Sequence, residues 1–368
     1  MGWQYRAAIL DASPMARQSK QMTTGKQPYR ILAIDGGGVR GVIPAIWLDR
    51  LEKELGAPLN QYFDLVVGTS TGSLLACAVA TGMSMQEAAN IYRDSAGIVF
   101  PQGEGRFWEN AKRFVTKRFA GPQYPSDGLQ ATLKEVFGER EFGDCEIPAM
   151  VTTYNLLNRR ALMLKSWRSD HKHLPMWEVC AASSSAPTFF PAHVMRVGIA
   201  DLPLVDGGVV AASPAASALT EAIRINRDEG IDISLDDYVV VSLGTGVSTR
   251  HISIEEGLSW GPWDWAIPLF DIVFDGNRQA VNYMCRNLLR QDNYIRVQVR
   301  LDAPSSDMDN SEPSNMNALA ATAQNYLAQD EGKQMLQRIV DKLRTTVPEG
   351  GASVHTLRPT DPFSGQAG

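Results

Sequence analysis

Two patterns of hydrophobic positions follow one another along most of the chain. Short apolar runs indicate buried strands, and apolar residues spaced three or four apart indicate amphipathic helices. The expected strands cover residues 29–34, 65–67, 148–154, 160–166, 238–243 and 293–299. The expected helices cover residues 43–55, 74–80, 84–93, 126–138, 176–182, 214–223, 271–289, 315–327 and 331–343. Because strands and helices alternate, we expect an α/β fold with a mostly parallel central sheet and helices on both faces.

Some segments do not follow this alternation. Residues 1–28 are polar and lack periodicity, so we expect an N-terminal arm that either lies on the main domain or is disordered. Residues 29–345 form the main domain, and the Gly- and Pro-containing residues 346–368 are expected to be a disordered tail. Residues 260–265 are expected to be an aromatic loop packed under a surface turn.

Residues 107–119 combine aromatic and basic side chains on one predicted helix. The apolar side of this helix either packs on the core, with its cations in water, or forms an interfacial surface that meets anionic lipid. Both interpretations stay open from the sequence.

Composition limits the classes of function. The 368 residues are 44% hydrophobic, enough for a large core, and the net charge of −6 gives no support to nucleic-acid binding. No apolar stretch is long enough to span a bilayer and the N-terminus lacks a secretory pattern, so we expect a cytoplasmic protein whose membrane contact, if any, is peripheral, at the inner membrane. The four cysteines lack zinc-site spacing, so we expect free thiols, no metal and no cofactor. The oligomeric state is not indicated.

Gly68-Thr-Ser-Thr-Gly72 is the first stretch that points to chemistry. It follows an apolar run that suits a buried strand and precedes a small-residue run that suits a helix. This is the context of a nucleophile elbow, in which Gly68 and Gly72 permit a sharp turn and Ser70 is exposed at the strand tip. Ser70 is therefore a candidate nucleophile.

Asp35-Gly-Gly-Gly-Val-Arg-Gly41 is a second glycine-rich stretch, also between a predicted strand and a helix. Gly36, Gly37 and Gly38 can turn successive amides toward one point, where Arg40 would reinforce the positive field. Such donors stabilise the oxyanion of acyl transfer. The alternative is a plain tight turn.

A serine nucleophile needs a base, and the sequence offers two kinds. A hydrolase with the order Ser, Asp, His would use His251 or His355. Asp206, which precedes Gly207 and Gly208, is the other candidate, as a carboxylate that acts directly. Because ligands bind beyond the carboxyl ends of parallel strands, the three glycine-rich turns are expected to converge on one crevice.

These three blocks, in this order, resemble the signature blocks of the patatin-like phospholipase family, in particular bacterial patatin-like acyl hydrolases. Residues 153–155, 185–191 and 242–246 resemble further blocks, and the resemblance extends over residues 29–328. It implies a three-layer patatin-like fold and a metal-free Ser70–Asp206 dyad that cleaves acyl esters of phospholipids or other lipids through an acyl-enzyme. It also implies that Gly36, Gly37, Gly38 and Arg40 form the oxyanion region. One departure is Ala212-Ser213-Pro214, where the family often has Asn-Asn-Pro, and this changes the hydrogen bonds expected around the aspartate turn.

Rival interpretations remain. Gly36-x-Gly38-x-x-Gly41 also fits a dinucleotide-binding oxidoreductase, but the second strand ends in Gly68-Thr69-Ser70 rather than in an acidic residue. A P-loop fails because Gln27 follows Lys26. Some bacterial members of the family are activated by cyclic nucleotides to degrade membranes in phage defence, which makes a cyclic dinucleotide activator a second hypothesis. A non-catalytic storage or binding protein is a third.

Overall fold

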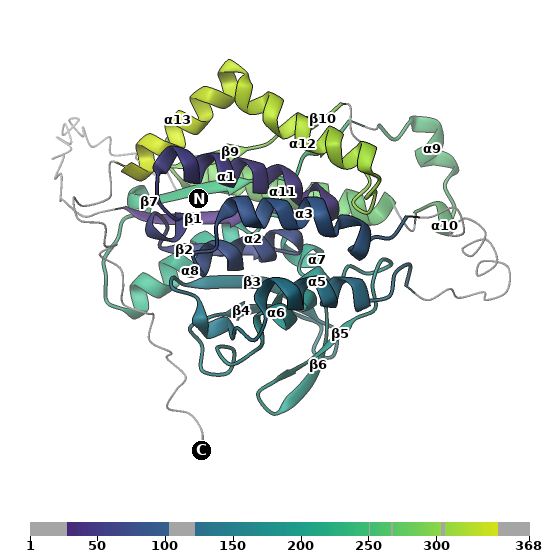
Figure 1. Ribbon diagram of the computed structural model, residues 1–368, viewed down its shortest axis with the longest axis horizontal. Coiled ribbons are helices and arrows are strands. Elements are labelled where there is room, and N and C mark those ends of the chain that lie inside the picture. Colours follow the sequence, from purple (N-terminus) through teal and green to yellow (C-terminus); the bar gives the residue numbers. More distant parts are fainter. Residues whose placement is uncertain (1–27, 103–121, 250, 266–267, 303–305, 345–368) are drawn as a thin grey trace, which may run out of the picture.

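A single large sheet forms the centre of the molecule (Figure 1). The computed structural model describes residues 28–102, 122–249, 251–265, 268–302 and 306–344. Within them the strand order is β5-β6-β3-β2-β1-β7-β9, and β4 pairs with β3. The pairs that join β3, β2, β1, β7 and β9 are parallel, whereas β4 and β6 run antiparallel to β3. The strands are β1 Tyr29–Ile34, β2 Leu65–Thr69, β3 Ala149–Asn155, β4 Arg160–Lys165, β5 His193–Val197, β6 Ala200–Asp206, β7 Tyr238–Leu243 and β9 Tyr294–Val297.

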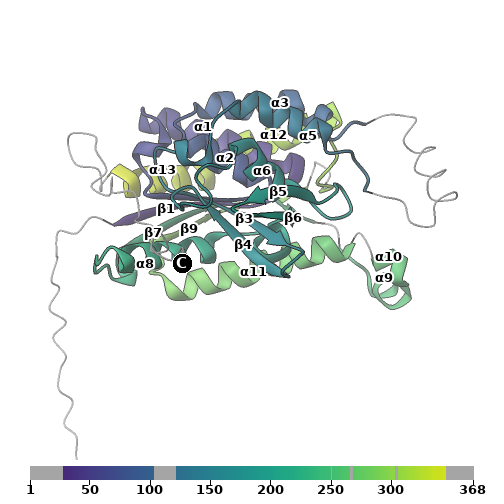
Figure 2. The same cartoon turned by 90° about the horizontal axis from the view of Figure 1, so that it is seen from below.

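Helices cover both faces of the sheet, so the architecture has three layers, as Figure 2 shows. One face carries α1 Val42–Leu55, α2 Thr71–Ala80, α3 Met85–Val99, α5 Asp127–Phe137, α6 Met176–Ser184, α12 Pro313–Ala328 and α13 Asp330–Arg344. The other face carries α8 Ala215–Asp228 and α11 Pro268–Leu288. Short elements connect these layers: α7 Gly208–Ala211, α9 Ile254–Ser259, α10 Pro262–Trp265, β8 Val247–Ser248 and β10 Arg300–Leu301.

The strands are buried on both sides, which explains their continuous apolar runs. Successive side chains of a strand point to opposite faces. Leu32 and Ile34 of β1 join the core under the α1–α2–α3 layer, and Ile31 and Ala33 join the core under α8 and α11. The predicted α/β fold with a mostly parallel sheet and helices on both faces is therefore confirmed.

Strands β2 and β6 approach each other end to end along one edge of β3. Thr152 of β3 pairs with Thr69 of β2, and the next residue, Thr153, pairs with Asp206 of β6. The other edge of β3 is filled by β4, so β2 and β6 must share the remaining edge. The last residue of β6 and the residue that follows β2 therefore meet at the same point of the sheet.

The structure also departs from the expected elements. A strand that ends at Asp206 was expected, but β5 and its hairpin with β6 were not, and the expected loop at residues 260–265 contains the short helix α10. The four cysteines are free, as predicted, and all four are buried. The predicted arm (1–28, except its last residue), the basic aromatic helix (107–119) and the tail (346–368) lie outside the described residues. None of the described helices is long and apolar enough to cross a bilayer.

Candidate active site

Ser70 occupies a strained turn between β2 and α2. Its backbone φ of 54° and ψ of −125° lie in a region that side chains other than glycine rarely adopt. The turn is tight because Gly68 and Gly72 leave no space for a Cβ: one on Gly68 would collide with the Gly72 carbonyl, and one on Gly72 with the Ile34 carbonyl. The hydroxyl of Ser70 faces a cavity as the predicted nucleophile elbow requires.

Two serines hold this strained turn in place. The Ser70 amide donates to Ser183 Oγ at 2.8 Å, and Ser183 Oγ donates to the Thr152 carbonyl at 2.7 Å. The Ser70 carbonyl accepts hydrogen bonds from Ser73 N at 2.8 Å and from Ser73 Oγ at 2.6 Å. Ser183 was not among the predicted site residues. Its role depends on the contact of α6 with the elbow, which no local pattern reveals.

Asp206 lies beside Ser70 with one carboxylate oxygen free. Oδ1 accepts a hydrogen bond from the Gly208 amide at 2.7 Å, whereas Oδ2 has no hydrogen-bond partner among the described residues. The carboxyl is only 1% exposed, and burial raises its pKa from 3.8 to about 7, although the Ser70 hydroxyl, the Gly208 amide and the charge of Arg278 act in the opposite direction. Such a carboxyl gains and loses its proton near neutral pH, as a general base must.

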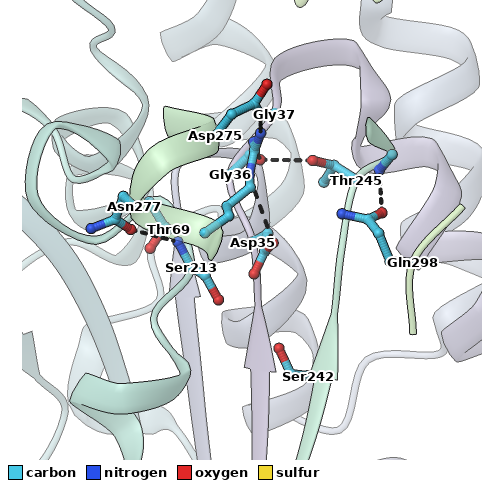
Figure 3. A network of polar contacts seen from close by, with 12 residues as sticks. Asp35, Gly36, Gly37, Thr69, Ser213, Ser242, Thr245, Asp275, Asn277 and Gln298 are labelled. Atoms are coloured by element: carbon cyan, nitrogen blue, oxygen red, sulfur yellow. Dashed lines mark hydrogen bonds and ion pairs between the residues drawn. The ribbon is translucent and has the colours of Figure 1, made fainter. Parts of the chain in front are cut away.

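Side-chain donors hold the carbonyls of the glycine-rich turn in fixed directions. The Gly36 carbonyl accepts from Thr245 Oγ1 at 2.8 Å, a contact drawn in Figure 3, and from Arg278 Nη2 at 2.6 Å. The Gly37 carbonyl accepts from Arg40 Nε at 3.3 Å. In a trans peptide the carbonyl and the following N–H point in opposite directions. These contacts therefore fix the directions of the Gly37 and Gly38 amides.

Two amides of this turn are free to bind an oxyanion. Gly36 N donates to the Ala212 carbonyl at 3.0 Å and Val39 N to the Met308 carbonyl at 2.9 Å. Gly37 N and Gly38 N have no acceptor among the described residues, and both glycines line the cavity with Ser70. Hydrogen bonds from charged groups to a peptide carbonyl polarise the peptide and strengthen its N–H as a donor. Arg278 and Arg40 act in this way on Gly37 and Gly38.

Two arginines support the glycine-rich turn and the aspartate that precedes it. Arg40 is buried, its Nη1 donates to the Ser306 carbonyl at 3.1 Å, and burial followed by repulsion from Arg278 lowers its pKa to about 10. It does not line the cavity itself. Asp35 accepts two hydrogen bonds from Arg296, at 3.0 and 2.5 Å. This paired, buried carboxylate supports the loop and is not available as a base.

The two free amides, Ser70 and Asp206 line one end of an apolar cavity. Its volume is about 860 Å³ when the space at its open mouth is included. The wall between α3, α5 and the loop at residues 186–190 is almost entirely hydrocarbon. Its main apolar side chains are Ile91, Val99, Phe100, Leu129, Leu133 and Phe190. A long apolar group that enters here would place its polar end between Ser70 and the two amides.

The departure at Ala212-Ser213 is compensated by α11. Asn277 accepts a hydrogen bond from the Ser213 amide at 3.3 Å (Figure 3) and donates to the Val210 carbonyl at 3.1 Å. The Ala212 carbonyl in turn binds Gly36 N. The aspartate turn is therefore tied both to α11 and to the glycine-rich turn, without the Asn-Asn pair.

The structure brings most of the predicted site residues together. Ser70, Asp206, Gly37 and Gly38 line one cavity, and Gly207 and Gly208 form the turn after Asp206. His251 is exposed and outside the cavity, His355 lies outside the described residues, and no described histidine lines the cavity. The described residues contain no group of three His, Cys, Asp or Glu side chains arranged to hold a metal ion.

Comparison with known proteins places these features in a family context. A family model described as patatin-like phospholipase matches residues 32–219. The chain is 27% identical to patatin of Solanum tuberosum over 359 residues, which cover 90% of this chain and 92% of patatin. It is 26% identical over 341 residues to a protein of the same plant named "Probable inactive patatin-3-Kuras 1", covering 85% of this chain and 90% of that protein. The crystal structure of VipD from Legionella pneumophila matches with a TM-score of 0.40 and 12% identity, covering 82% of this chain and 67% of VipD.

Proposed function

This chain belongs to the patatin-like phospholipase family, which makes it a serine acyl hydrolase, and we propose that it cleaves fatty-acyl esters of phospholipids or related lipids through a Ser70–Asp206 dyad. One relative bears a name that calls it inactive, so the case for activity here depends on the residues. The observation that carries it is the buried carboxyl of Asp206, which lies beside the Ser70 hydroxyl at the polar end of an apolar cavity and whose Oδ2 has no hydrogen-bond partner among the described residues.

The proposed reaction has two halves. Asp206 Oδ2 accepts the Ser70 proton while Ser70 Oγ attacks the acyl carbonyl, and the oxyanion is bound by the amides of Gly37 and Gly38. The proton then passes to the leaving alkoxide, and the acyl group remains on Ser70. In the second half, Asp206 takes a proton from water, the resulting hydroxide attacks the acyl-enzyme, and Ser70 regains a proton as the fatty acid leaves.

Among the residues predicted for the oxyanion region, the geometry favours a division of roles. Gly37 and Gly38 donate, because their amides have no acceptor within the part of the chain that the structure describes. The Gly36 amide is engaged by Ala212, so Gly36 contributes through its carbonyl, which accepts from Thr245 and Arg278. Arg40 supports the Gly37 carbonyl.

A fatty-acid release assay on mixed phospholipid vesicles tests this function. Ser70→Ala and Asp206→Ala should each reduce the rate by several orders of magnitude. His251→Ala, which removes the exposed rival base, should leave the rate unchanged. A Ser70→Ala protein that still releases fatty acid would exclude the dyad, and a large loss in His251→Ala with little loss in Asp206→Ala would assign the base to histidine.

Activation by a cyclic dinucleotide, a bacterial source and a role in phage defence remain hypotheses from the sequence. The same assay addresses activation when it is repeated with a panel of cyclic dinucleotides. A rate that rises only in their presence would support an activated effector, and a rate that does not change across the panel would favour a self-sufficient hydrolase.

A further inference from the structure

The segment that connects β7 to α11 exposes a set of large apolar side chains. Ile254 and Leu258 of α9 are 82% and 84% exposed, and they lie one turn apart on the same face of the helix. A capping box between Ser253 and Glu256 stabilises this short helix, so its exposed face does not result from a frayed end. Together the exposed side chains form what we call the apolar arm: Ile252, Ile254, Leu258, Leu269, Ile272 and Val273.

The apolar arm lies at the edge of the sheet where the active site opens. Strand β7 runs parallel to β1, so the segment after Leu243 leaves the sheet at the same edge as the glycine-rich turn at Gly36. Helix α11 then begins at this edge and ends at the opposite one, where β9 starts. Figures 1 and 2 both show α9 and α10 projecting from the body of the molecule beyond the first turns of α11.

The arm adjoins a cavity residue in the sequence. Val273 is 44% exposed at the surface, and its neighbour Phe274 is buried and lines the cavity with Ser70 and Asp206. Water-exposed apolar surface next to an apolar cavity offers a path along which an acyl chain need not cross open water. A water-filled gap between the lipid and the cavity would remove that advantage.

The charges of the arm specify which lipid surface fits. Between His251 and Asp275 the sequence has no lysine or arginine, and it carries the carboxylates of Glu255, Glu256, Asp264 and Asp271. Anionic headgroups would repel these carboxylates, whereas zwitterionic headgroups are neutral overall. The arm therefore suits a zwitterionic surface, in contrast to the basic aromatic residues 107–119.

We propose that the apolar arm docks on the surface of a zwitterionic phospholipid bilayer and delivers acyl chains to the cavity beside Phe274. This inference rests on the proposed lipid hydrolysis for its purpose, but the docking itself is a binding event that is measured without catalysis.

Co-flotation with phosphatidylcholine vesicles tests the docking. The Ser70→Ala background prevents lipid degradation during the measurement. Ile254→Gln and Leu258→Gln should each lower the partition of the protein onto the vesicles about tenfold. This is the effect of withdrawing one large aliphatic side chain from an apolar environment. Leu288→Gln is the matched control, because Leu288 is 55% exposed on α11 at the opposite edge of the sheet. It should leave partition unchanged.

Hydrolysis separates docking from chemistry. With Ser70 restored, Leu258→Gln should lower fatty-acid release from phosphatidylcholine vesicles about tenfold and leave hydrolysis of the water-soluble ester p-nitrophenyl butyrate unchanged. Wild type that hydrolyses neither substrate but floats with vesicles through the arm would contradict the proposed function and keep the docking surface.

Other outcomes would overturn the docking proposal. Partition that occurs only on vesicles with phosphatidylglycerol, and is equal in wild type and Leu258→Gln, would assign membrane contact to another segment. A loss of self-association in Leu258→Gln, with no change in vesicle partition, would make the arm a contact between two copies of the chain.

Discussion

Asp206→Asn should abolish hydrolysis and also stabilise the fold, by an amount that grows with pH. The buried carboxyl has a pKa of about 7 in the folded protein, and in the unfolded chain it returns to its ordinary value of 3.8. Between these values the folded protein retains a proton that the unfolded chain has released. Because the folded state binds more protons, stability falls as pH rises through this window.

The size of the effect follows from the two pKa values. At 1.36 kcal/mol per pKa unit, the buried carboxyl destabilises the fold by about 1.5 kcal/mol at pH 5 and by about 4 kcal/mol at pH 8. Asparagine carries no charge, and its amide oxygen can still accept the Gly208 N–H. The free energy of unfolding of Asp206→Asn, relative to wild type, should therefore increase by about 2.5 kcal/mol between pH 5 and pH 8.

Urea denaturation at pH 5, 6, 7 and 8, followed by tryptophan fluorescence, measures this difference. Ser70→Ala is the control, since it should be equally inactive but keeps the carboxyl. Its stability should fall with pH at least as much as that of wild type, because the Ser70 hydroxyl lowers the pKa of Asp206 and is then absent. A difference between Asp206→Asn and wild type that is constant over this range would refute the argument, because the carboxyl would then have the same pKa in both states.

Four further predictions concern the rate and the substrate. The base must be ionised, so kcat/KM should rise about tenfold per pH unit below a midpoint near 7 and level off above it, as a pH–rate profile would show; a flat profile between pH 5 and pH 8 would contradict this role of Asp206. Arg278→Gln should lower kcat by about tenfold to a hundredfold and move that midpoint upward, because the guanidinium both polarises the Gly36–Gly37 peptide and lowers the pKa of Asp206. Thr245→Val, which removes an uncharged donor from the same carbonyl, should lower kcat without moving the midpoint, and equal midpoints in the two variants would exclude the electrostatic role of Arg278. Leu133→Phe should fill part of the cavity wall and shift the preference toward shorter acyl chains in a competition assay, and an unchanged preference would place the chain elsewhere.

The boundaries of many elements could be predicted from local patterns, even where the expected contacts did not form. The helix predicted over residues 84–93 begins where expected, with Ser84 immediately before α3, but the Ser84 side chain caps no amide. Instead, Glu52 of α1 accepts the Met85 amide at 2.9 Å. The pattern marks where a helix begins, whereas the partner that satisfies its first amide is decided by tertiary packing.

The three glycine-rich turns were expected to converge because the carboxyl ends of parallel strands lie together. This reason holds for only two of the turns. The turns after β1 and β2 meet because these strands are parallel. Asp206 reaches the same place from the opposite direction, since β6 is antiparallel to β3. Nothing in the apolar run before Asp206 indicates its direction, because direction depends on the hairpin with β5.

Arg278 was missed although the sequence carries a signal for it. Phe274, Arg278, Val281 and Cys285 follow the helical repeat, and all four are buried in the structure. A single cation in a buried apolar stripe needs a partner in the interior. In the structure its Nη1 is paired with Asp275 Oδ1 at 2.9 Å, three residues away, and its Nη2 donates to the Gly36 carbonyl. The Gly36 carbonyl is 242 residues away in the sequence, so this second partner could not be identified without the fold.

Helix α11 joins three of these features within a few turns. Its first residues belong to the apolar arm, Phe274 lines the cavity, and Arg278 Nη2 lies 2.6 Å from the Gly36 carbonyl. The helix therefore joins the end that we propose to dock on lipid to the peptide whose Gly37 amide we propose as an oxyanion donor. One residue inserted between Phe274 and Arg278 would turn the guanidinium by about 100° around the helix axis relative to the arm. Lipid contact would then persist in a protein whose catalytic peptide had lost its charged support.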